Sequence, residues 1–151
     1  MIEFQEEGFR AIRHELSQLI QEHYQEVASA PGKVVLEPAW DRFEALEAAG
    51  LLKVLTARDG DALVGYVIHI IAPSLHYRDL IQAHDDAHFL KKTHRKGFAA
   101  IKMLKAAEEM LRKYGVGSVS YHTKNREDIN RGTVFKRLGY KAHETIYTKF
   151  I

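Results

Sequence analysis

The sequence predicts a single α/β (α+β) domain, residues 1–151, built around a mixed sheet. Long stretches carry apolar residues at helical spacing, and short apolar or alternating runs are typical of strands. Two helices are expected before the first strand, and strands and helices alternate only toward the C-terminus. That order differs from the regular alternation of a doubly wound dinucleotide fold, and 151 residues are enough to enclose one full core.

Composition limits the classes of function. Hydrophobic residues make up 46% of the chain and charged residues 28%, as in ordinary soluble proteins. Without an apolar run of membrane-spanning length or a secretory signal pattern, we expect a cytoplasmic protein with no membrane partner. Cysteine is absent, which excludes disulfides, thiolate metal sites and a cysteine nucleophile. A net charge of +2 argues against a general nucleic-acid coat.

The N-terminal half is expected to contain two helices followed by a hairpin. Residues 8–28 place apolar side chains three and four apart, which predicts an amphipathic helix. A second helix is predicted for 38–49, because proline suits its first position and a glycine follows its end. Strands are predicted over 51–57 and 63–71, joined by a turn with Asp59-Gly60 at its tip.

The next predicted strand, 83–90, carries many ionisable groups. Strict alternation would divide it into two faces, one with His84, Asp86, His88 and Leu90 and the other with Asp85, Ala87 and Phe89. On one face, His84 and His88 would lie about 13 Å apart, so a shared metal ion is not expected. We interpret the strand as splayed at its end, where it opens into a site.

A basic stretch joins this strand to the next helix, 97–114, and reads Lys91-Lys92-Thr93-His94-Arg95-Lys96-Gly97-Phe98-Ala99-Ala100. The first N–H groups of a helix have no internal partner, and the macrodipole adds positive potential there. Gly97 allows the backbone to approach a ligand without a side chain between them. The pattern predicts a site for a phosphorylated ligand, such as a pyrophosphate. The alternative is a solvated basic face, since the spacing matches neither a P-loop nor Gly-x-Gly-x-x-Gly.

Three further elements are expected near the C-terminus. Apolar residues in 116–121 predict a strand. Asn125 is a suitable N-cap for a helix that ends near Leu138. The alternating segment 140–151 predicts a final strand or hairpin arm.

Taken in order, these features resemble the GNAT superfamily of acetyl-coenzyme-A-dependent N-acetyltransferases, and most of all its short bacteriophage and bacterial members. The family's phosphate loop, Arg/Gln-x-x-Gly-x-Gly/Ala, falls on His94-Arg95-Lys96-Gly97-Phe98-Ala99, with histidine at the first position. Its later signature falls on Asn125 and then Phe135-Lys136-Arg137-Leu138-Gly139-Tyr140. The hairpin Val54–Tyr66 is the third landmark.

The resemblance implies a mostly antiparallel sheet of about six to seven strands with about four flanking helices, splayed between strands 83–90 and 116–121. It implies acetyl-CoA as co-substrate and no metal. The pantetheine arm would pair with backbone at the end of the first of these strands, and the pyrophosphate would lie on the following helix start. The implied cofactor-binding residues are Phe89, Leu90, Lys91, His94, Arg95, Lys96, Gly97, Phe98, Ala99, Ala100, Asn125 and Phe135.

The resemblance also implies that a primary amine, of a small molecule or a protein, attacks the thioester directly in a ternary complex. Asp86 is the candidate base, and His84 and His88 are candidate bases or relays on its predicted face. At the position where the family often has a tyrosine acid, this chain has Phe135, which has no proton to donate. Water or Tyr121 is then left to protonate the departing thiolate.

The acceptor site is expected between the N-terminal helices and the loop after 63–71. Carboxylates and aromatic rings there suit a cationic amine, and the candidates are Glu22, Glu26, Tyr66, His76 and Tyr77. Two other interpretations stay open: a GNAT-like binding module with weak catalysis, acting for example on a host protein, and a nucleic-acid binder through residues 91–96. The latter predicts steep salt dependence, and the small net charge argues against it. The alternating segment 145–150 is a candidate for pairing across a homodimer.

Overall fold

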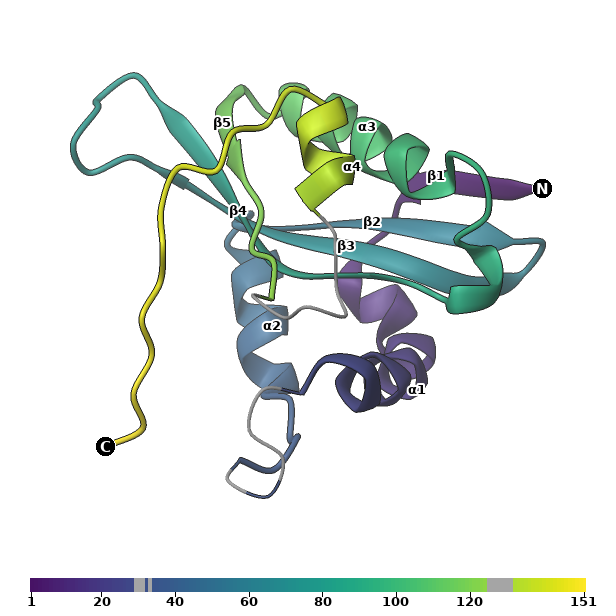
Figure 1. Ribbon diagram of the computed structural model, residues 1–151. Coiled ribbons are helices and arrows are strands. Elements are labelled where there is room, and N and C mark those ends of the chain that lie inside the picture. The colour runs from purple at the N-terminus through teal and green to yellow at the C-terminus, as the bar shows by residue number, and fades with distance from the viewer. Residues whose placement is uncertain (29–31, 33, 125–131) are drawn as a thin grey trace.

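The computed structural model describes residues 1–28, 32, 34–124 and 132–151, and its elements form three layers (Figure 1). Helices α1 (Phe9–Val27) and α2 (Trp40–Ala48) cover one face of the sheet. Helices α3 (Ala99–Arg112) and α4 (Gly132–Arg137) cover the other face. Within the described part of the chain, no helix combines the length and the apolar character needed to cross a membrane.

The sheet has five strands in the order β1-β2-β3-β4-β5. These strands are β1 (Ile2–Glu6), β2 (Leu52–Asp59), β3 (Ala62–Pro73), β4 (Ile81–Leu90) and β5 (Val116–Ser120). The first four pair antiparallel, and β4 pairs with β5 in parallel. A short 3-10 helix, η1 (Lys92–His94), connects β4 to α3. The predicted mixed, mostly antiparallel sheet is confirmed, with five strands rather than about six to seven.

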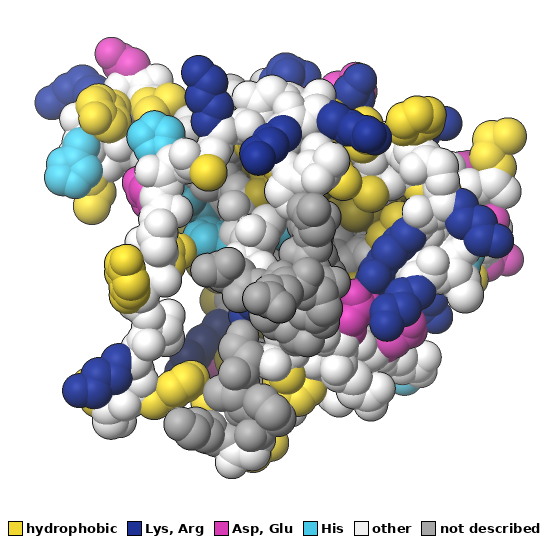
Figure 2. Space-filling view, in the orientation of Figure 1, with side chains coloured by type: hydrophobic (Ala, Val, Ile, Leu, Met, Phe, Trp, Pro, Cys, Tyr) yellow, Lys and Arg dark blue, Asp and Glu magenta, His cyan; other side chains and the backbone are white. Residues whose placement is uncertain are grey.

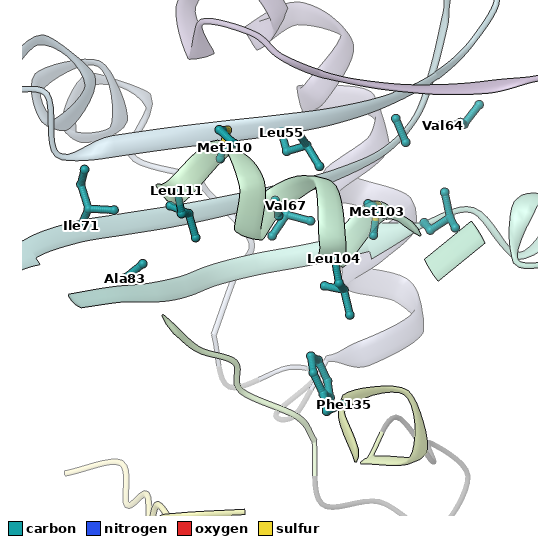
Figure 3. Close-up of a cluster of buried hydrophobic side chains, with 13 residues drawn as sticks. Leu55, Val64, Val67, Ile71, Ala83, Met103, Leu104, Met110, Leu111 and Phe135 are labelled. Atoms are coloured by element: carbon teal, nitrogen blue, oxygen red, sulfur yellow. The ribbon is translucent and has the colours of Figure 1, made fainter. Parts of the chain in front are cut away.

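Each face of the sheet has its own apolar core. Between the sheet and α3, side chains such as Val67, Leu104 and Leu111 are almost fully buried, and Figure 3 shows them meeting across the two layers. The opposite core includes Phe9 and Ile12 of α1. The helical and strand periodicities read from the sequence therefore correspond to real buried faces.

Two features at the ends of the chain differ from the prediction. Strand β1 was not expected, because it is short and its partner β2 lies more than 50 residues along the chain, with Ile2 opposite Asp59. The strand predicted for 140–151 is wrong: these residues form no strand, and from Lys141 onward they are exposed. Alternation favours an extended chain but supplies no hydrogen-bond partner, and Figure 1 shows this segment running away from the sheet. The helix predicted from Asn125 is described only from Gly132, since 125–131 lie outside the described residues.

A β-bulge in β4 corrects the predicted faces of that strand. Ile68 of β3 pairs with Ala87, and the next residue of β3 pairs with Asp85, so Asp86 has no partner in this ladder. The extra residue reverses the alternation. Asp85 and His88 consequently share the α3 face of the sheet, and the single face predicted for His84, Asp86 and His88 is wrong.

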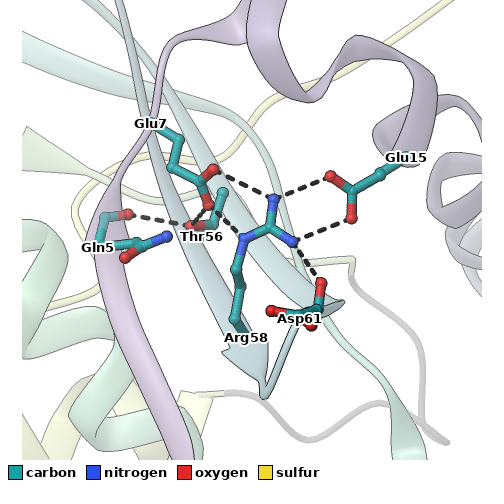
Figure 4. Close-up of polar contacts among 6 residues, drawn as sticks. All are labelled: Gln5, Glu7, Glu15, Thr56, Arg58 and Asp61. Atoms are coloured by element: carbon teal, nitrogen blue, oxygen red, sulfur yellow. Dashed lines mark hydrogen bonds and ion pairs between the residues drawn. The ribbon is translucent and has the colours of Figure 1, made fainter.

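A polar cluster connects α1 with the end of β1 and with β2 (Figure 4). The Arg58 cluster consists of Glu7, Glu15, Thr56 and Arg58. The Arg58 guanidinium donates to both carboxylates over 2.7–3.1 Å, and the Thr56 hydroxyl donates to Glu7 over 2.5 Å. The hydrogen bond from Arg58 lowers the pKa of Glu7 to about 2. We interpret this cluster as structural, because its polar groups bind one another.

Candidate active site

The start of α3 has the local structure expected of an anion site. Gly97 has φ +61°, and a β-carbon there would meet open space. No side chain caps α3, and its first turn contains no acidic residue. The free N–H groups and the macrodipole therefore face outward with no negative charge of the helix to neutralise them.

Cationic side chains of the loop divide into two groups. Three of them reach carboxylates of α1 and of the end of β2, in the ion pairs Lys91–Glu22 at 3.6 Å, His94–Asp59 at 3.4 Å and Arg95–Glu26 at 2.7 Å. Lys92 and Lys96 are exposed and have no carboxylate within ion-pair distance in the described ranges. Figure 2 shows Lys and Arg side chains on the surface of the molecule with acidic side chains among them. Two lysines thus remain available to an anion, while the other cations brace the loop.

Arg95 fixes the loop against the body of the protein. Its guanidinium binds Glu26 of α1 through two nitrogens, at 2.7 and 2.8 Å. Its Nε donates to the carbonyl of Leu90 over 2.6 Å, and the group lies 5.3 Å from the centre of the Phe89 ring. The side chain therefore points toward α1, and the backbone N–H of Arg95 donates to the carbonyl of Lys92 in η1 over 3.3 Å.

The outer edge of β4 is open next to this loop. Pairing of β4 with β5 ends at His84 opposite Ser120. Beyond that point, Phe89 and Leu90 pair with β3 on one side, and on the other side they pair with no strand of the described chain. This agrees with the predicted splay and leaves backbone groups of β4 available to an extended ligand.

A second polar group, the Asp85 cluster, lies where the two strands separate and consists of His69, Asp85, His88, Tyr121 and His122. One oxygen of Asp85 accepts a hydrogen bond from Nδ1 of His88 over 2.6 Å. The other accepts from the backbone N–H and from Nδ1 of His122, each over 2.7 Å. The Asp85 side chain is only 3% exposed, so a buried carboxylate bridges two imidazoles.

The Asp85 cluster also contains buried polar atoms without partners. Within the described residues these are both ring nitrogens of His69, Nε2 of His88 and the hydroxyl of Tyr121. Burial lowers the pKa of His69 to about 4 and raises the pKa of Tyr121. Burial opposes ionisation of Asp85, but the hydrogen bonds from His88 and His122 outweigh it and hold its pKa below the usual value. Unsatisfied buried polar atoms are costly and tend to mark functional sites.

Asp86 lies in a different environment, on the face of the sheet that α1 covers. It is exposed, yet partial desolvation and the neighbouring Asp85 charge raise its pKa. Burial, together with the charge of Asp86, raises the pKa of Tyr66. The Tyr66 hydroxyl is hydrogen-bonded to Nδ1 of His23 over 2.7 Å, and the His23 ring stacks on Phe89 at 4.8 Å.

The predicted acceptor residues separate into two places. Glu22, Glu26 and Tyr66 lie near one another between α1 and the end of β4, with both carboxylates paired to the loop. His76 and Tyr77 lie in the β3–β4 connection, where the Ser74 hydroxyl accepts hydrogen bonds from their backbone N–H groups. Seven residue steps along β3 separate Tyr66 from Pro73, a span of about 23 Å, so the fold does not bring His76 and Tyr77 to Tyr66.

Other predicted site residues are placed as follows. His84 is exposed, Phe135 is buried, and Asn125 lies outside the described residues.

Asp85 and His122 were not predicted from the sequence as site residues. His122 directly follows the predicted strand 116–121, and Asp85 belongs to the predicted strand 83–90 beside it, so the sequence did indicate that the two could lie close together. The bulge that turns Asp85 inward depends on pairing with β3 and has no signature in the local sequence. The described residues contain no group of three or more potential metal ligands.

Comparison with known proteins identifies the fold. No protein-family model matches the chain, and no curated protein matches it. The structure is similar to that of ribosomal-protein-alanine N-acetyltransferase from Brucella melitensis biovar Abortus 2308, with a TM-score of 0.73, 16% identity, and coverage of 100% of this chain and 99% of that one. It is also similar to the aminoglycoside acetyltransferase meta-AAC0020 from an uncultured soil metagenomic sample, in complex with sisomicin, with TM-score 0.74, 12% identity and coverage of 99% and 95%.

A third similar structure is a predicted acetyltransferase with acetyl-CoA from Clostridium acetobutylicum, with TM-score 0.75, 13% identity and coverage of 99% and 96%. All three similarities extend over almost the whole of both chains. The chain therefore has the fold of the GNAT acetyltransferases, as its sequence landmarks indicated.

Proposed function

We propose that this chain is an acetyl-CoA-dependent N-acetyltransferase that transfers the acetyl group to a primary amine by direct attack in a ternary complex. The observation that carries the proposal is the uncapped start of α3, free of acidic residues, beside the open edge of β4. A ligand that has both an anionic group and an extended, amide-containing arm could bind the helix start through its anion and the strand edge through its arm. The acetyl-CoA and acceptor complexes of similar structures support the same assignment.

The residues present fit a coenzyme A group. The N–H groups from Lys96 to Phe98 and that of Ala100 would hold the pyrophosphate, helped by the exposed Lys92 and Lys96. The N–H groups of Arg95 and Ala99 already donate to the carbonyls of Lys92 and Lys96. Backbone groups of β4 from Phe89 to Lys91 would hold the pantetheine arm. When bound, acetyl-CoA supplies the activated acetyl group, and the protein supplies orientation and proton transfer.

Asp86 is our candidate for the residue that takes a proton from the incoming ammonium. Its raised pKa brings a carboxylate closer to the range that suits a general base. It lies on the α1 side of the sheet, near enough to Tyr66 for its charge to raise the pKa of that residue, so we place the acceptor there and expect a cationic amine. Asp86→Asn should lower turnover about 100-fold with little change in acetyl-CoA affinity, and an unaltered rate would dismiss it as the base.

Calorimetric titration with acetyl-CoA, coenzyme A and ATP tests the cofactor site. Gly97→Asp places a carboxylate at the helix start and should weaken both coenzyme species at least tenfold, about 1.4 kcal/mol. Gly50→Asp is the matched control, because Gly50 also has positive φ and open space around its β-carbon but lies after α2. Both variants should lose a similar amount of stability, on the order of 1–2 kcal/mol.

The titration distinguishes the proposed enzyme from its alternatives. Equal affinity in Gly97→Asp and the wild type would remove the loop assignment, and no binding of acetyl-CoA would reject the proposal. Turnover is then measured by thiol release with spermidine, an aminoglycoside, free amino acids, and peptides offering an N-terminus or a lysine. Binding without turnover for any amine would favour a binding module, for which Phe135 in place of a tyrosine is the supporting observation.

A further inference from the structure

The Asp85 cluster contains a proton-transfer arrangement that the function proposed above does not use. His122 is half exposed at 52%, while the Asp85 carboxylate that holds it is 3% exposed. Because Nδ1 of His122 donates to Asp85, Nε2 is left to face away from the carboxylate, and it has no partner among the described residues. A buried carboxylate that fixes the tautomer of an accessible imidazole is a recurrent device for moving protons.

The position of His122 follows from the end of the β4–β5 ladder. After His84 and Ser120 the strands no longer pair through backbone groups. Instead, the side chain of Asp85 accepts the N–H of His122 over 2.7 Å and so bridges the separating strands. This places the imidazole at the mouth of the open edge of β4, where we expect the reactive end of the pantetheine arm.

A purely structural role for Asp85 would account for the bridge but not for the rest of the cluster. Bridging needs only an acceptor for one N–H, and a neutral side chain could supply it. The cluster keeps four buried polar atoms without a described partner, a cost that apolar side chains would avoid. It also lies against Phe135, whose ring centre is 5.0 Å from that of Tyr121 and 5.9 Å from that of His88.

We propose that His122, oriented by Asp85, is the acid that protonates the departing coenzyme A thiolate, the role that Phe135 cannot fill. This inference rests on the proposed acetyltransferase function. As the carbon–sulfur bond breaks, its electron pair passes to sulfur, and sulfur takes the proton from Nε2 of His122. Asp86 takes one proton from the ammonium, the freed amine nitrogen bonds to the carbonyl carbon, and the second proton leaves that nitrogen for solvent as the amide forms. Asp86 then releases its proton to solvent, and solvent returns a proton to the half-exposed imidazole.

The other groups of the cluster suit this step less well. His69 is fully buried and its pKa is about 4, so its ring is uncharged at neutral pH and is a very weak acid. Burial raises the pKa of Tyr121, which makes its phenol a weaker acid. His88 is 11% exposed and has no route to solvent comparable to that of His122. Asp85 would act as a positioning residue, because its carboxylate accepts from Nδ1 of His122 and so fixes the orientation of the ring.

The test measures the ionisation of coenzyme A bound to the whole chain, using the ultraviolet absorbance of its thiolate as pH is varied. An imidazolium next to sulfur stabilises the thiolate. We expect the thiol pKa in the wild-type complex to be about one unit, or tenfold, lower than in His122→Gln. Other titratable groups of the region, His69, His88, Asp86, Tyr121, Tyr140, Glu108 and the nearby Lys124, are the same in both proteins.

Two further variants separate position from charge. Asp85→Asn keeps an oxygen that can accept the N–H of His122 but removes the negative charge. The thiol pKa in this variant should therefore lie between its wild-type value and its value in His122→Gln. His14→Gln removes an exposed histidine of α1 and should leave it unchanged. His122→Gln should also lower kcat about 100-fold with nearly constant KM for acetyl-CoA.

Each outcome bears on a separate claim. Failure of coenzyme A to bind the wild-type chain would reject the proposed function and this inference with it. If coenzyme A binds but its thiol titrates identically in the wild type and in His122→Gln, the acid assignment alone is rejected. Because His122 is half exposed, its substitution should fold, so the decision does not depend on Asp85→Asn.

Discussion

The Arg58 cluster and the Asp85 cluster both contain a buried or half-buried charge held by hydrogen bonds, but they differ in completeness. In the first, Arg58 donates to two carboxylates and Thr56 donates to Glu7. In the second, only Asp85 is fully hydrogen-bonded, while Tyr121 and the ring of His69 have no described partner. A complete network fixes elements in place, whereas an incomplete one keeps donors and acceptors available.

The difference indicates how each cluster relates to stability and function. The Arg58 cluster joins β1, α1 and β2, and its loss should loosen that corner. The Asp85 cluster lies where β4 and β5 separate, and its unpartnered atoms should reduce stability rather than add to it. We therefore expect similar substitutions to lower the free energy of unfolding in the Arg58 cluster and to raise it in the Asp85 cluster.

The largest effect is expected for Arg58→Leu. This substitution leaves Glu7 and Glu15 without their cation, and the guanidinium is only 15% exposed. Breaking such a pair should lower the free energy of unfolding by about 3–4 kcal/mol, measured by urea denaturation. Arg10→Leu is the control, since Arg10 is 75% exposed in its pair with Glu44 and should cost less than about 0.5 kcal/mol. A loss below 1 kcal/mol in Arg58→Leu would contradict a structural role for this cluster.

A change in stability of intermediate size is expected when the pH is lowered. The pKa of His69 falls from 6.5 to about 4 on burial, so between these values the unfolded chain binds a proton that the folded chain does not. Stability should therefore decrease as pH falls from about 6.5 to about 4, by about 2–3 kcal/mol. Urea denaturation in this range should show the slope in the wild type and lose most of it in His69→Phe.

The Arg58 cluster should respond in a lower pH range. The pKa of Glu7 is lowered from 4.5 to about 2, so its contribution is present above pH 4.5 and is lost as pH falls toward 2. Glu7→Gln should remove this part of the acid sensitivity and leave the His69 slope unchanged. If His69→Phe and Glu7→Gln altered the same pH range, the two clusters would not be separable in this way.

The smallest effects are expected from single hydroxyl groups, and they should have opposite signs. Tyr121→Phe removes a buried hydroxyl with no described partner and should raise the free energy of unfolding by about 1 kcal/mol. Thr56→Val removes a hydroxyl that donates to Glu7 and should lower it by about 1 kcal/mol. Thermal unfolding of both variants provides the measurement, and destabilisation of equal size in both would mean that the Tyr121 hydroxyl is satisfied in the folded protein.

Much of the fold was readable from local sequence patterns. The apolar period of residues 100–114 predicted α3 and its buried face. Met103, Leu104, Ala107, Met110 and Leu111 are buried as that period predicted, Ala100 is half-buried, and Tyr114, which was expected on the same face, is exposed. Asp59-Gly60 predicted the hairpin between β2 and β3. Gly97 was predicted to let the backbone approach a ligand without a side chain between them, and a β-carbon there would indeed meet open space. These features depend on neighbours within a few residues, which is why the sequence alone sufficed.

Other features were settled only by the packing of distant segments. Strand β1 exists because β2 offers it an edge, whereas the alternating segment 140–151 finds no such edge and forms no strand. The bulge at Asp86 arises from the register between β3 and β4, and it turns Asp85 inward toward His122, 37 residues away. Sequence periodicity determined which residues could be buried together; strand register, which depends on contacts between segments far apart in the chain, decided which polar groups meet.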